Sequence, residues 1–386
     1  MLDSVDRRAL LMAAGTAGAL SALPALAAGN VSEETAPAGF DAAPFVKQSI
    51  KFAVIGLDHY HIFGMTAAVQ RGGGKLAKFY SADPKQIADF KAKFGDIKLA
   101  RSEDEILHDK SIKLVAAAPI PDERAPLGIR VMRAGKDYLS DKPAITTLGQ
   151  LAEVRKAVAE TKRKFAVMYS ERLEVKAAIE AGYLIDRGAI GKVVQTINIA
   201  PHRIGNADAG GRPAWFWDKA RFGGILTDIG SHQIEQFLYY TGSTTARVVA
   251  SQTANFNHPQ YPDFEDFGDM VAVGNGGTGY IRVDWFTPDG LDTWGDGRLF
   301  ILGTEGYIEL RKYTDIAGRP GGNHLFMVDK KGVRFIDCSN VVLPFGPQFV
   351  SDIIHRTDTA QNQDEALLAA ELVLTAEKNA TRAVLA

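Results

Sequence analysis

The stretch Lys51–Met65, KFAVIGLDHYHIFGM, determines how the first half of the chain is interpreted. Its apolar run, Phe52–Ile55, ends at Gly56, as a buried strand does before a tight turn. A dinucleotide-binding turn continues as G-x-G-x-x-G, because the glycines permit the turn and let backbone N–H groups approach a pyrophosphate. Here the second glycine position holds Asp58 and the third holds His61. The stretch therefore predicts a nucleotide-binding strand and turn with an altered loop.

Strands and helices alternate along the rest of the first half. The helix predicted at 84–95 has proline at its start and glycine at its end, the asymmetry that helix termini favour. Strands are expected at 50–56, 75–82, 112–119, 136–143 and 164–170, and helices at 62–71, 84–95, 125–135 and 147–163. Such alternation forms βαβ units and a doubly wound parallel sheet. We therefore predict a Rossmann-type domain at 49–169.

The second half has a different pattern. One helix is predicted at 172–188 and an amphipathic one at 364–385, with β-rich runs and glycine-rich turns between them. Alternation of polar and apolar residues in these runs is typical of an antiparallel sheet with one face covered. The predicted fold class is thus α/β followed by α+β. The C-terminal domain, 170–386, is expected to contain a large, open, mostly antiparallel sheet.

The N-terminal segment predicts export. Arg7 and Arg8 precede a run rich in Ala, Gly and Leu, which ends in small residues around Ala25–Ala27. These are the parts of a secretory signal, and the arginine pair resembles a twin-arginine signal. The run is interrupted by glycines and Pro24 and is short for a membrane span of about 20 residues. We expect a twin-arginine-like signal at 1–28 and a periplasmic mature protein without a membrane span; a Sec signal or an uncleaved anchor is the alternative.

Composition bounds the classes of function. The net charge is −2 and no long basic run occurs, so no nucleic-acid partner is expected. The single cysteine, Cys338, excludes an intrachain disulfide and a multi-thiolate metal site. Residues 29–48 are polar and rich in Ala and Pro without periodicity, which predicts a flexible arm.

Lys142 is the first candidate for chemistry. It lies in Ser-Asp-Lys-Pro-Ala, 140–144, at the end of the fourth predicted strand, where doubly wound sheets bind ligands. Pro143 restricts the backbone and disfavours a helix at Lys142. A partly desolvated lysine there can donate a hydrogen bond to a substrate oxygen or transfer a proton. The alternative that these residues leave open is a surface lysine before a turn.

Asp228 and His232 form the second candidate pair, in the stretch Gly223–Gly242. Residues four apart lie on one face of a helix, and Glu235 follows at the next turn. A carboxylate beside an imidazole can orient the ring and stabilise its protonated form, as a general base requires. The alternative is a helix-capping Asp and a packed histidine.

The order of three segments resembles the glucose–fructose oxidoreductase/inositol dehydrogenase/MocA (Gfo/Idh/MocA) family. A Rossmann-type first half is followed by (E/D)-K-P at 141–143 and by G-G-x-x-x-D-x-G-x-H-x-x-(D/E) at 223–235. GTEGYIEL, 303–310, is similar to a late strand of that family. The resemblance implies an NAD(P) domain and a C-terminal domain whose open sheet face packs in oligomers, so a homodimer or homotetramer is expected.

The resemblance also implies hydride transfer between the nicotinamide and a hydroxyl-bearing carbon of a sugar or cyclitol. Lys142 matches the lysine that contacts the reacting oxygen, His232 the acid/base histidine, and Asp228 its supporting acid, which can also touch substrate. Aromatic and charged side chains nearby suit a sugar, because its apolar face stacks on rings and its hydroxyls need polar partners. The further substrate candidates are Arg203, Trp215, Trp217 and Arg221. The two tryptophans could equally belong to the core.

The cofactor side departs from the family pattern at several positions. Asp58 puts a negative charge where the pyrophosphate would lie, and His61 adds bulk where helix and strand pack closely. Ser81 aligns with the ribose-binding carboxylate, with Asp83 two residues late, and Glu123 stands in place of a family histidine. The candidate cofactor residues are Gly56, Leu57, Asp58, His61, Ser81, Asp83, Pro119, Glu123 and Lys142. The expected cofactor is NAD or NADP, held tightly during export.

Three hypotheses follow. The favoured one is a periplasmic NAD(P)-dependent sugar or cyclitol oxidoreductase, for which no metal ligand is predicted. The second is a glycoside-acting enzyme that oxidises its substrate transiently and recycles its nicotinamide. The third is a non-redox protein that binds sugar, or a divalent metal through Asp58, His59 and His61 with His202 or His232, since His/Asp sets suit zinc or manganese.

Overall fold

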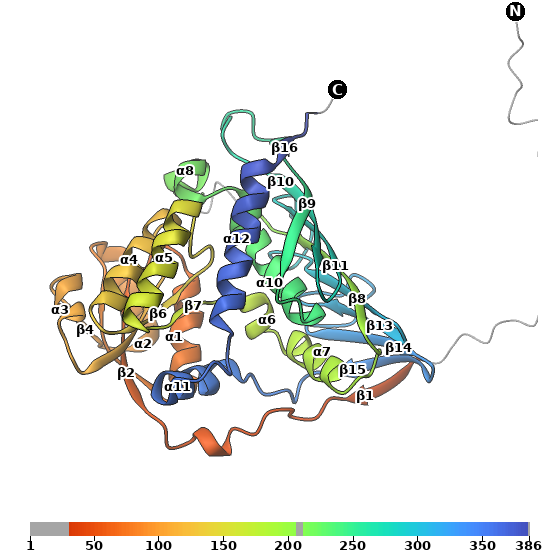
Figure 1. Ribbon diagram of the computed structural model, residues 1–386, viewed down its shortest axis with the longest axis horizontal. Coiled ribbons are helices and arrows are strands. Elements are labelled where there is room, and N and C mark those ends of the chain that lie inside the picture. Colours follow the sequence, from red (N-terminus) through yellow and green to blue (C-terminus); the bar gives the residue numbers. More distant parts are fainter. Residues whose placement is uncertain (1–30, 206–210, 385–386) are drawn as a thin grey trace, which may run out of the picture.

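The computed structural model describes residues 31–205 and 211–384. The predicted fold class is confirmed, because the described residues form a six-stranded parallel sheet and a ten-stranded, mostly antiparallel sheet. Figure 1 shows the parallel sheet and its helices on one side, the large sheet on the other, and the long helix α12 (Gln363–Asn379) between them. The predicted export signal at 1–28 lies outside the described residues.

The N-terminal domain is a six-stranded parallel sheet in the order β4-β3-β2-β5-β6-β7. This is the doubly wound order, in which ligands bind at the carboxyl ends of the strands where the order reverses, here between β2 and β5. Its strands are β2 (Ile50–Ile55), β3 (Gly74–Tyr80), β4 (Lys98–Leu99), β5 (Ile112–Ala117), β6 (Asp137–Ser140) and β7 (Phe165–Val167). Its helices are α1 (His61–Arg71), α2 (Pro84–Phe94), α3 (Glu103–Leu107), α4 (Pro121–Arg133) and α5 (Leu148–Thr161).

Local sequence explains most of these boundaries. The central strands β2 and β5 are buried at every position but one, as continuous apolar runs covered on both faces should be. Asp83 and Thr147 cap α2 and α5 through their side chains, and Pro84 occupies the first helical position. The sequence analysis did not predict β4 or α3, because both are too short to show a period.

The C-terminal domain is built on a ten-stranded mixed sheet in the order β1-β15-β14-β13-β12-β8-β11-β10-β9-β16. The strands of its body are β8 (Val193–Pro201), β9 (Ala246–Ala254), β10 (Phe267–Gly274), β11 (Thr278–Asp284), β12 (Arg298–Gly303), β13 (Gly306–Arg311), β14 (His324–Asp329) and β15 (Gly332–Asp337). Most neighbours are antiparallel, but β8 runs parallel to β11, β1 (Ser32–Thr35) to β15, and β16 (Thr381–Arg382) to β9.

Helices cover one face of this sheet. They are α6 (Ser170–Leu173), α7 (Lys176–Asp186), α9 (Ile225–Asp228), α10 (Gly230–Thr241) and α12. The short elements η4 (Ala214–Trp217) and α8 (Lys219–Phe222) pack on each other, and α8 packs on α4. Helix α11 (Phe345–His355) instead packs on α1. On the other face, large apolar side chains such as Val194, Leu302 and Tyr307 are exposed. The expectation of an open sheet with one covered face is confirmed.

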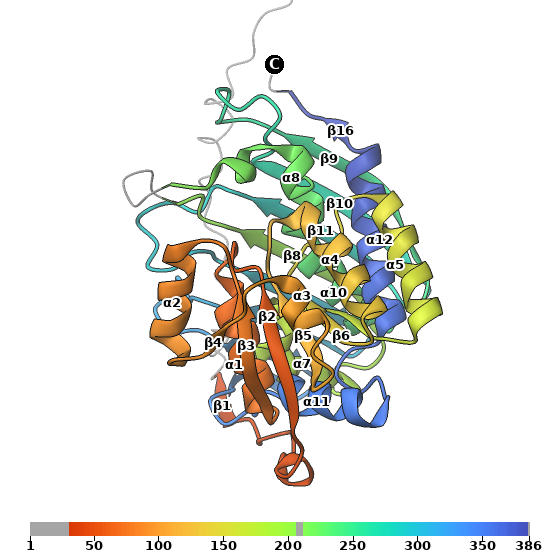
Figure 2. The same ribbon diagram turned by 90° about the vertical axis from the view of Figure 1, so that its left-hand side faces the viewer.

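Helix α12 joins the two domains. It packs on α9, α10 and β9 of the C-terminal domain and on α5 of the Rossmann domain, and Figure 2 shows α5 and α12 side by side. An ion pair between Arg155 and Glu371 lies at this contact, with 2.5 Å between Nη2 and Oε2. The helix thus fixes the position of the parallel sheet relative to α9 and α10.

The expectation of a flexible arm at 29–48 is wrong for part of that segment. Residues Ser32–Thr35 form β1, an edge strand paired with β15 from Arg334 to Asp337. Ala36 follows and is 3% exposed. The segment lacks a helical or strand period because all four residues of β1 are exposed, and backbone pairing to an open sheet edge orders it. In the part of the chain that the structure describes, no helix is long and apolar enough to cross a membrane.

Candidate active site

A narrow pocket lies between the domains, where the carboxyl ends of β2 and β6 face α9 and α10. Its free volume is about 70 Å³, room for about two water molecules at ~30 Å³ each. Four histidines line it, together with Lys142, Asp228, Glu171, Arg212 and several aromatic rings. This is the ligand-binding edge of a doubly wound sheet.

Lys142 and His232 both line this pocket, from opposite domains, as predicted. Lys142 follows β6, and its Nζ lies 2.8 Å from Oδ1 of Asp228. The side chains are 5% and 14% exposed. Burial alone would raise the pKa of Asp228, but the Lys142 ammonium outweighs burial and lowers that pKa. The pair is therefore an ammonium–carboxylate pair at neutral pH.

Asp228 does not support His232 in the way the sequence predicted. Helix α9 ends at Asp228 and α10 begins at Gly230, with the backbone of Ile229 between them in the helical region. The Asp228 carboxylate bonds to Lys142, whereas Nδ1 of His232 has no hydrogen-bond partner among the described residues. His232 is 2% exposed, and burial lowers its pKa well below the usual range. Its imidazole is therefore neutral at neutral pH. The Glu235 carboxylate bonds to Arg172 instead, with 2.7 Å between Oε1 and Nε.

Glu171 is a pocket residue that the sequence analysis missed. Its Oε2 accepts hydrogen bonds from Nζ of Lys312 at 3.0 Å and from Nε2 of Gln233 at 2.9 Å. Its Oε1 lies 3.8 Å from Nε2 of His202 and has no hydrogen-bond partner among the described residues. Burial raises the pKa of Glu171, but the neighbouring cations, Lys312 above all, outweigh burial and lower that pKa. No local motif marks Glu171, since its partners are distant in sequence.

Arg124 fixes the loop that carries Lys142. Its side chain is 1% exposed, and its Nε donates to the carbonyl of Pro119 at 2.8 Å. Its Nη1 donates to the carbonyl of Lys142 and, at 3.2 Å, to that of Pro143. The guanidinium thus links the ends of β5 and β6, which is how the backbone around Lys142 is held toward the pocket.

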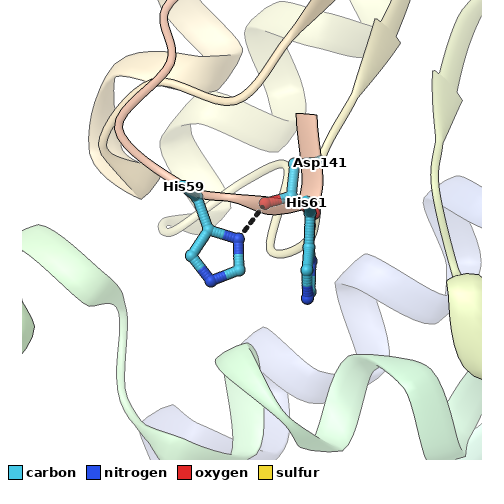
Figure 3. Close-up of side chains that lie close together, drawn as sticks. All are labelled: His59, His61 and Asp141. Carbon is cyan, nitrogen blue, oxygen red and sulfur yellow. Dashed lines mark hydrogen bonds and ion pairs between the residues drawn. The ribbon is translucent and has the colours of Figure 1, made fainter. Parts of the chain in front are cut away.

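Asp141 holds two histidines of the opening stretch. Its Oδ2 lies 2.7 Å from Nδ1 of His59, and its Oδ1 lies 2.9 Å from Nδ1 of His61. Figure 3 shows both rings projecting the same way from this contact. Burial lowers the pKa of His59 to about 3, and His61 adds to that effect. The predicted cofactor residue His61 lines the pocket, and its ring contacts the Asp141 carboxylate.

Aromatic rings close another side of the pocket, but only one of the two predicted tryptophans belongs to it. Trp215 lines the pocket, as do Trp285 and Trp294, which the sequence analysis did not select. Trp217 stacks on Tyr261 with 3.9 Å between ring centroids and a 14° interplanar angle. The prediction for Trp217 is wrong because Trp217, two positions after Trp215 in the short helix η4, packs on Tyr261 instead of lining the pocket.

The predicted arginines lie outside the pocket, and two others, Arg124 and Arg212, line it. Arg221 pairs with Glu123, with 2.9 Å between Nη2 and Oε1, so both residues join α8 to α4 at the surface. Arg203 donates to the carbonyl of Pro288 at 2.9 Å. These three predicted site residues thus have structural contacts instead. Arg212 lines the pocket, with its guanidinium carbon 4.7 Å from the ring centroid of Phe216.

The tight turn that the sequence predicts after β2 is present in the structure. Gly56 has a φ of 75°, and a Cβ there would lie 2.7 Å from Cβ of Pro119. Leu57 is buried beside it. Asp58 is exposed and accepts a hydrogen bond from Nε2 of Gln86 at 3.1 Å.

The two ribose candidates follow β3. Ser81 donates from Oγ to Oε1 of Gln86 at 2.7 Å. Asp83 caps α2, because its Oδ1 accepts from the backbone N–H groups of Lys85 at 2.7 Å and Gln86 at 3.2 Å. The Asp83 carboxylate is therefore committed to the helix.

Two family models match the chain. Residues 50–169 match the oxidoreductase family with an NAD-binding Rossmann fold, and residues 179–309 match the Gfo/Idh/MocA C-terminal domain. A crystal structure from Erwinia carotovora atroseptica SCRI1043, of a protein with an oxidoreductase assignment, is 48% identical with a TM-score of 0.84. The match covers 87% of this chain and 100% of that one.

More distant relatives carry named activities. Inositol 2-dehydrogenase 2 from Saccharopolyspora erythraea is 25% identical over 267 residues, which are 67% of this chain and 74% of the relative. An oxidoreductase of Schizosaccharomyces pombe is 29% identical over 155 residues, so the chain spans 40% of that relative's length. The domain order, the pocket between the sheets and these matches lead to one conclusion: the chain belongs to the Gfo/Idh/MocA family, and its first domain is an NAD-binding Rossmann domain.

Proposed function

We propose that this chain is an NAD(P)-dependent oxidoreductase that acts on a hydroxyl-bearing carbon of a sugar or cyclitol. The observation that carries the proposal is the convergence of Lys142, Asp228 and His232 on one pocket at the ligand-binding edge of the Rossmann sheet. Relatives named as inositol and D-xylose dehydrogenases support the substrate class.

The proposed proton chemistry uses groups that differ in charge. The Lys142 ammonium, held by Asp228, donates a hydrogen bond to the substrate oxygen and stabilises negative charge that develops there. The neutral imidazole of His232 accepts the hydroxyl proton, which a protonated histidine could not do. The nicotinamide supplies the hydride acceptor when it is bound. Alignment of both groups on one substrate carbon is what an interdomain pocket provides.

The residues at the turn fit a dinucleotide in most respects. Gly56 keeps the tight turn, and α1 begins just behind it with no acidic residue in its first turn, so the helix N-terminus favours an anion. The backbone of Gly56 and Leu57, with Ser81 and Pro119, would hold the cofactor. Asp58 is exposed, so its carboxylate can face solvent.

The nicotinamide end requires movement. A free volume of about 70 Å³ leaves no space for a nicotinamide ring beside a substrate. Tyr60 is 63% exposed and can rotate outward, whereas His59 is held by Asp141. We therefore expect cofactor binding to displace the Tyr60 ring, while the His59 ring stays on Asp141.

The remaining wall supports a polyhydroxylated substrate. Trp215, Trp285 and Trp294 offer ring faces, and Arg212 offers a cation among them. Such a mixture suits the apolar face and hydroxyl rim of a sugar. We also propose export through the arginine-pair signal, and self-association through the exposed apolar residues of the open sheet face.

The test is binding followed by turnover. Purified protein is titrated with NADH and NADPH by nicotinamide fluorescence, and then supplied with NAD⁺ or NADP⁺ and a panel of inositols and aldoses. The proposal predicts saturable binding and substrate-dependent reduction. No binding of either nucleotide, and none found bound after purification, would contradict it. Turnover of a glycoside without added nucleotide, by protein that retains one, would assign the transient-oxidation reaction instead.

A further inference from the structure

Arg212 lines the interdomain pocket and has N–H groups to spare. Its Nε donates to the carbonyl of Ile204 at 2.6 Å, and its Nη2 donates to the carbonyl of Arg203 at 3.0 Å. These two bonds use one edge of the planar guanidinium, whose five N–H donors are arranged in fixed forks. The second edge, formed by Nη1 and the other N–H of Nη2, has no hydrogen-bond partner among the described residues.

The other lysines, arginines and carboxylates at the pocket form ion pairs with one another. The pairs are Lys142–Asp228, Arg124–Asp141 and Lys312–Glu171, with 2.8, 3.0 and 3.0 Å between the charged atoms. Arg212 forms no ion pair with any described residue and lies over two rings instead. Its guanidinium carbon is 4.7 Å from the ring centroid of Phe216 and 4.9 Å from that of Trp285. The described part of the pocket therefore carries one positive charge that no carboxylate balances.

The surroundings of Arg212 make this charge costly. Burial lowers the pKa of Arg212, and Tyr60 and Asp228 oppose that effect without cancelling it. A guanidinium nevertheless stays protonated in proteins, so a partly desolvated cation lies at the pocket without the anion that would offset its loss of water. An anionic group on a bound molecule would supply that compensation.

The same wall of the pocket offers an acceptor for a hydroxyl. Trp285, which Arg212 overlies, contacts His202 with 5.5 Å between ring centroids, and Nε2 of His202 lies 3.8 Å from Oε1 of Glu171. Glu171 is 3% exposed, and this oxygen has no hydrogen-bond partner among the described residues. An ionised carboxylate only accepts hydrogen bonds, so the buried oxygen calls for an O–H donor on a ligand.

We propose that the pocket binds a sugar acid, whose carboxylate is held by Arg212 and one of whose hydroxyls donates to Oε1 of Glu171. The inference rests on the proposed oxidoreductase function and names the substrate class of the same site. The free guanidinium fork matches the two oxygens of a carboxylate. A phosphate group carries about −1.5 to −2 at neutral pH, which exceeds the one positive charge that Arg212 contributes.

The proposed reaction itself is unchanged. The hydroxyl carbon of the sugar acid loses its hydride to the oxidised nicotinamide, and the hydroxyl oxygen loses its proton to His232. The products are a keto acid and the reduced nucleotide. Arg212 touches the substrate away from the reacting carbon, so its part is to select and align the acid.

The test compares matched substrates on the wild type. D-glucuronate and D-galacturonate are compared with D-glucose and D-galactose, which have a hydroxymethyl group where the acids have their carboxylate. They are also compared with the two uronamides, which keep the shape of the acids without the charge. Reduction of NAD⁺ or NADP⁺ gives kcat/KM, and calorimetry without nucleotide gives affinity. We expect both quantities to be about 30-fold higher or more for the acids, as a hydrogen-bonded charge pair produces.

Arg212→Gln removes the charge and the fork. The ratio of acid to uronamide, in affinity and in kcat/KM, should then fall to roughly one. Arg221→Gln is the matched control, because Arg221 pairs with Glu123 at the surface and lies outside the pocket. This control should keep the preference of the wild type. Circular dichroism and thermal unfolding show whether both variants are folded, and the comparison of acid with uronamide on the wild type needs no variant.

The outcomes separate this inference from the proposed function. A wild type that oxidises neutral sugars or uronamides as well as the acids overturns the inference and leaves the oxidoreductase standing. An equal preference for the acids in Arg212→Gln and Arg221→Gln also overturns it, as does a preference for the corresponding sugar phosphates. Acid binding that depends on Arg212, in a protein that binds no nucleotide, would keep the carboxylate site and remove the redox function.

Discussion

The buried pair of Lys142 and Asp228 gives a prediction that needs no knowledge of the substrate. Lys142→Met removes the ammonium and leaves the Asp228 carboxylate in a position that is 14% exposed. Removal of one partner of a buried pair costs about 3–5 kcal/mol. That is a large part of the ~5–15 kcal/mol by which domains are stable. We expect the free energy of unfolding to fall by about 3 kcal/mol or more at neutral pH.

The pH dependence of this loss has a definite sign. In the wild type Lys142 holds the pKa of Asp228 below its usual range, so the pair stabilises the fold at neutral pH and loses that effect only in acid. In Lys142→Met, the main opposing charge is gone, so burial outweighs the smaller contribution of Arg124 and raises the pKa of Asp228. The deficit relative to the wild type should therefore shrink as the pH falls through that raised pKa.

Urea unfolding of four proteins measures the coupling. They are the wild type, Lys142→Met, Asp228→Asn and the double variant. The double variant removes both charges and should recover most of the loss, which gives a coupling free energy of about 2–3 kcal/mol. Lys85→Met is the control, because Lys85 pairs with Asp89 at the surface and its loss should leave the midpoint unchanged. Additive single effects, or a deficit that grows in acid, would refute the reasoning.

Three further predictions concern separate contacts. Trp217→Ala should lower the free energy of unfolding by about 3 kcal/mol, because Trp217 stacks on Tyr261. Trp215→Ala should leave the free energy of unfolding nearly unchanged and raise KM roughly ten-fold, because Trp215 lines the pocket. If urea titrations and kinetics gave the reverse pattern, the two tryptophans would have exchanged roles. Asp58→Gly should tighten NADH binding about five-fold, since it removes a negative charge from the altered loop. An NADH affinity that is unchanged or weaker in fluorescence titrations would contradict this. Burial lowers the pKa of His202 to about 4, so the neutral form of His202 stabilises the fold fully above pH 6.5. As the pH falls from 6.5 toward 4, about 1.4 kcal/mol of that stability is lost per pH unit. His202→Asn should therefore flatten the plot of unfolding temperature against pH, whereas His355→Asn, at an exposed position, should not.

The elements that position the site could be predicted from sequence because their signals are local. The strand ending at Ser140 and the proline after Lys142 place that lysine at the edge of the sheet. The glycine-bounded helix carrying His232 has an apolar face that must be buried. Neither inference required a long-range contact, and both residues line the pocket.

The partners within the pocket could not be predicted, because they meet only in three dimensions. Glu171 contacts Lys312, 141 positions away, and no periodic pattern links them. The Asp228 carboxylate bonds to Lys142, 86 positions away, rather than to the imidazole four residues on, and no local pattern indicated that partner. Arg203 was selected from the sequence, but it donates to the carbonyl of Pro288, and Arg212 lines the pocket.

The stretch Lys51–Met65 shows both what the sequence could predict and what it could not. Gly56 predicted the turn correctly, and the substitutions at 58 and 61 indicated that the loop had changed. The sequence did not show that His59 and His61 share the carboxylate of Asp141, which lies 80 and 82 positions away. That contact places two imidazoles in the pocket that Lys142 also lines.

The reduction of NAD⁺ or NADP⁺ by the wild type and by Lys142→Met, followed by nicotinamide absorbance with inositols and aldoses, tests the central claim most directly. We predict substrate-dependent reduction by the wild type and a rate at least about 100-fold lower in the variant, as loss of a positioned proton or hydrogen-bond donor produces. Equal rates in the two proteins, or no reduction by wild-type protein saturated with nucleotide across the whole panel, would contradict it.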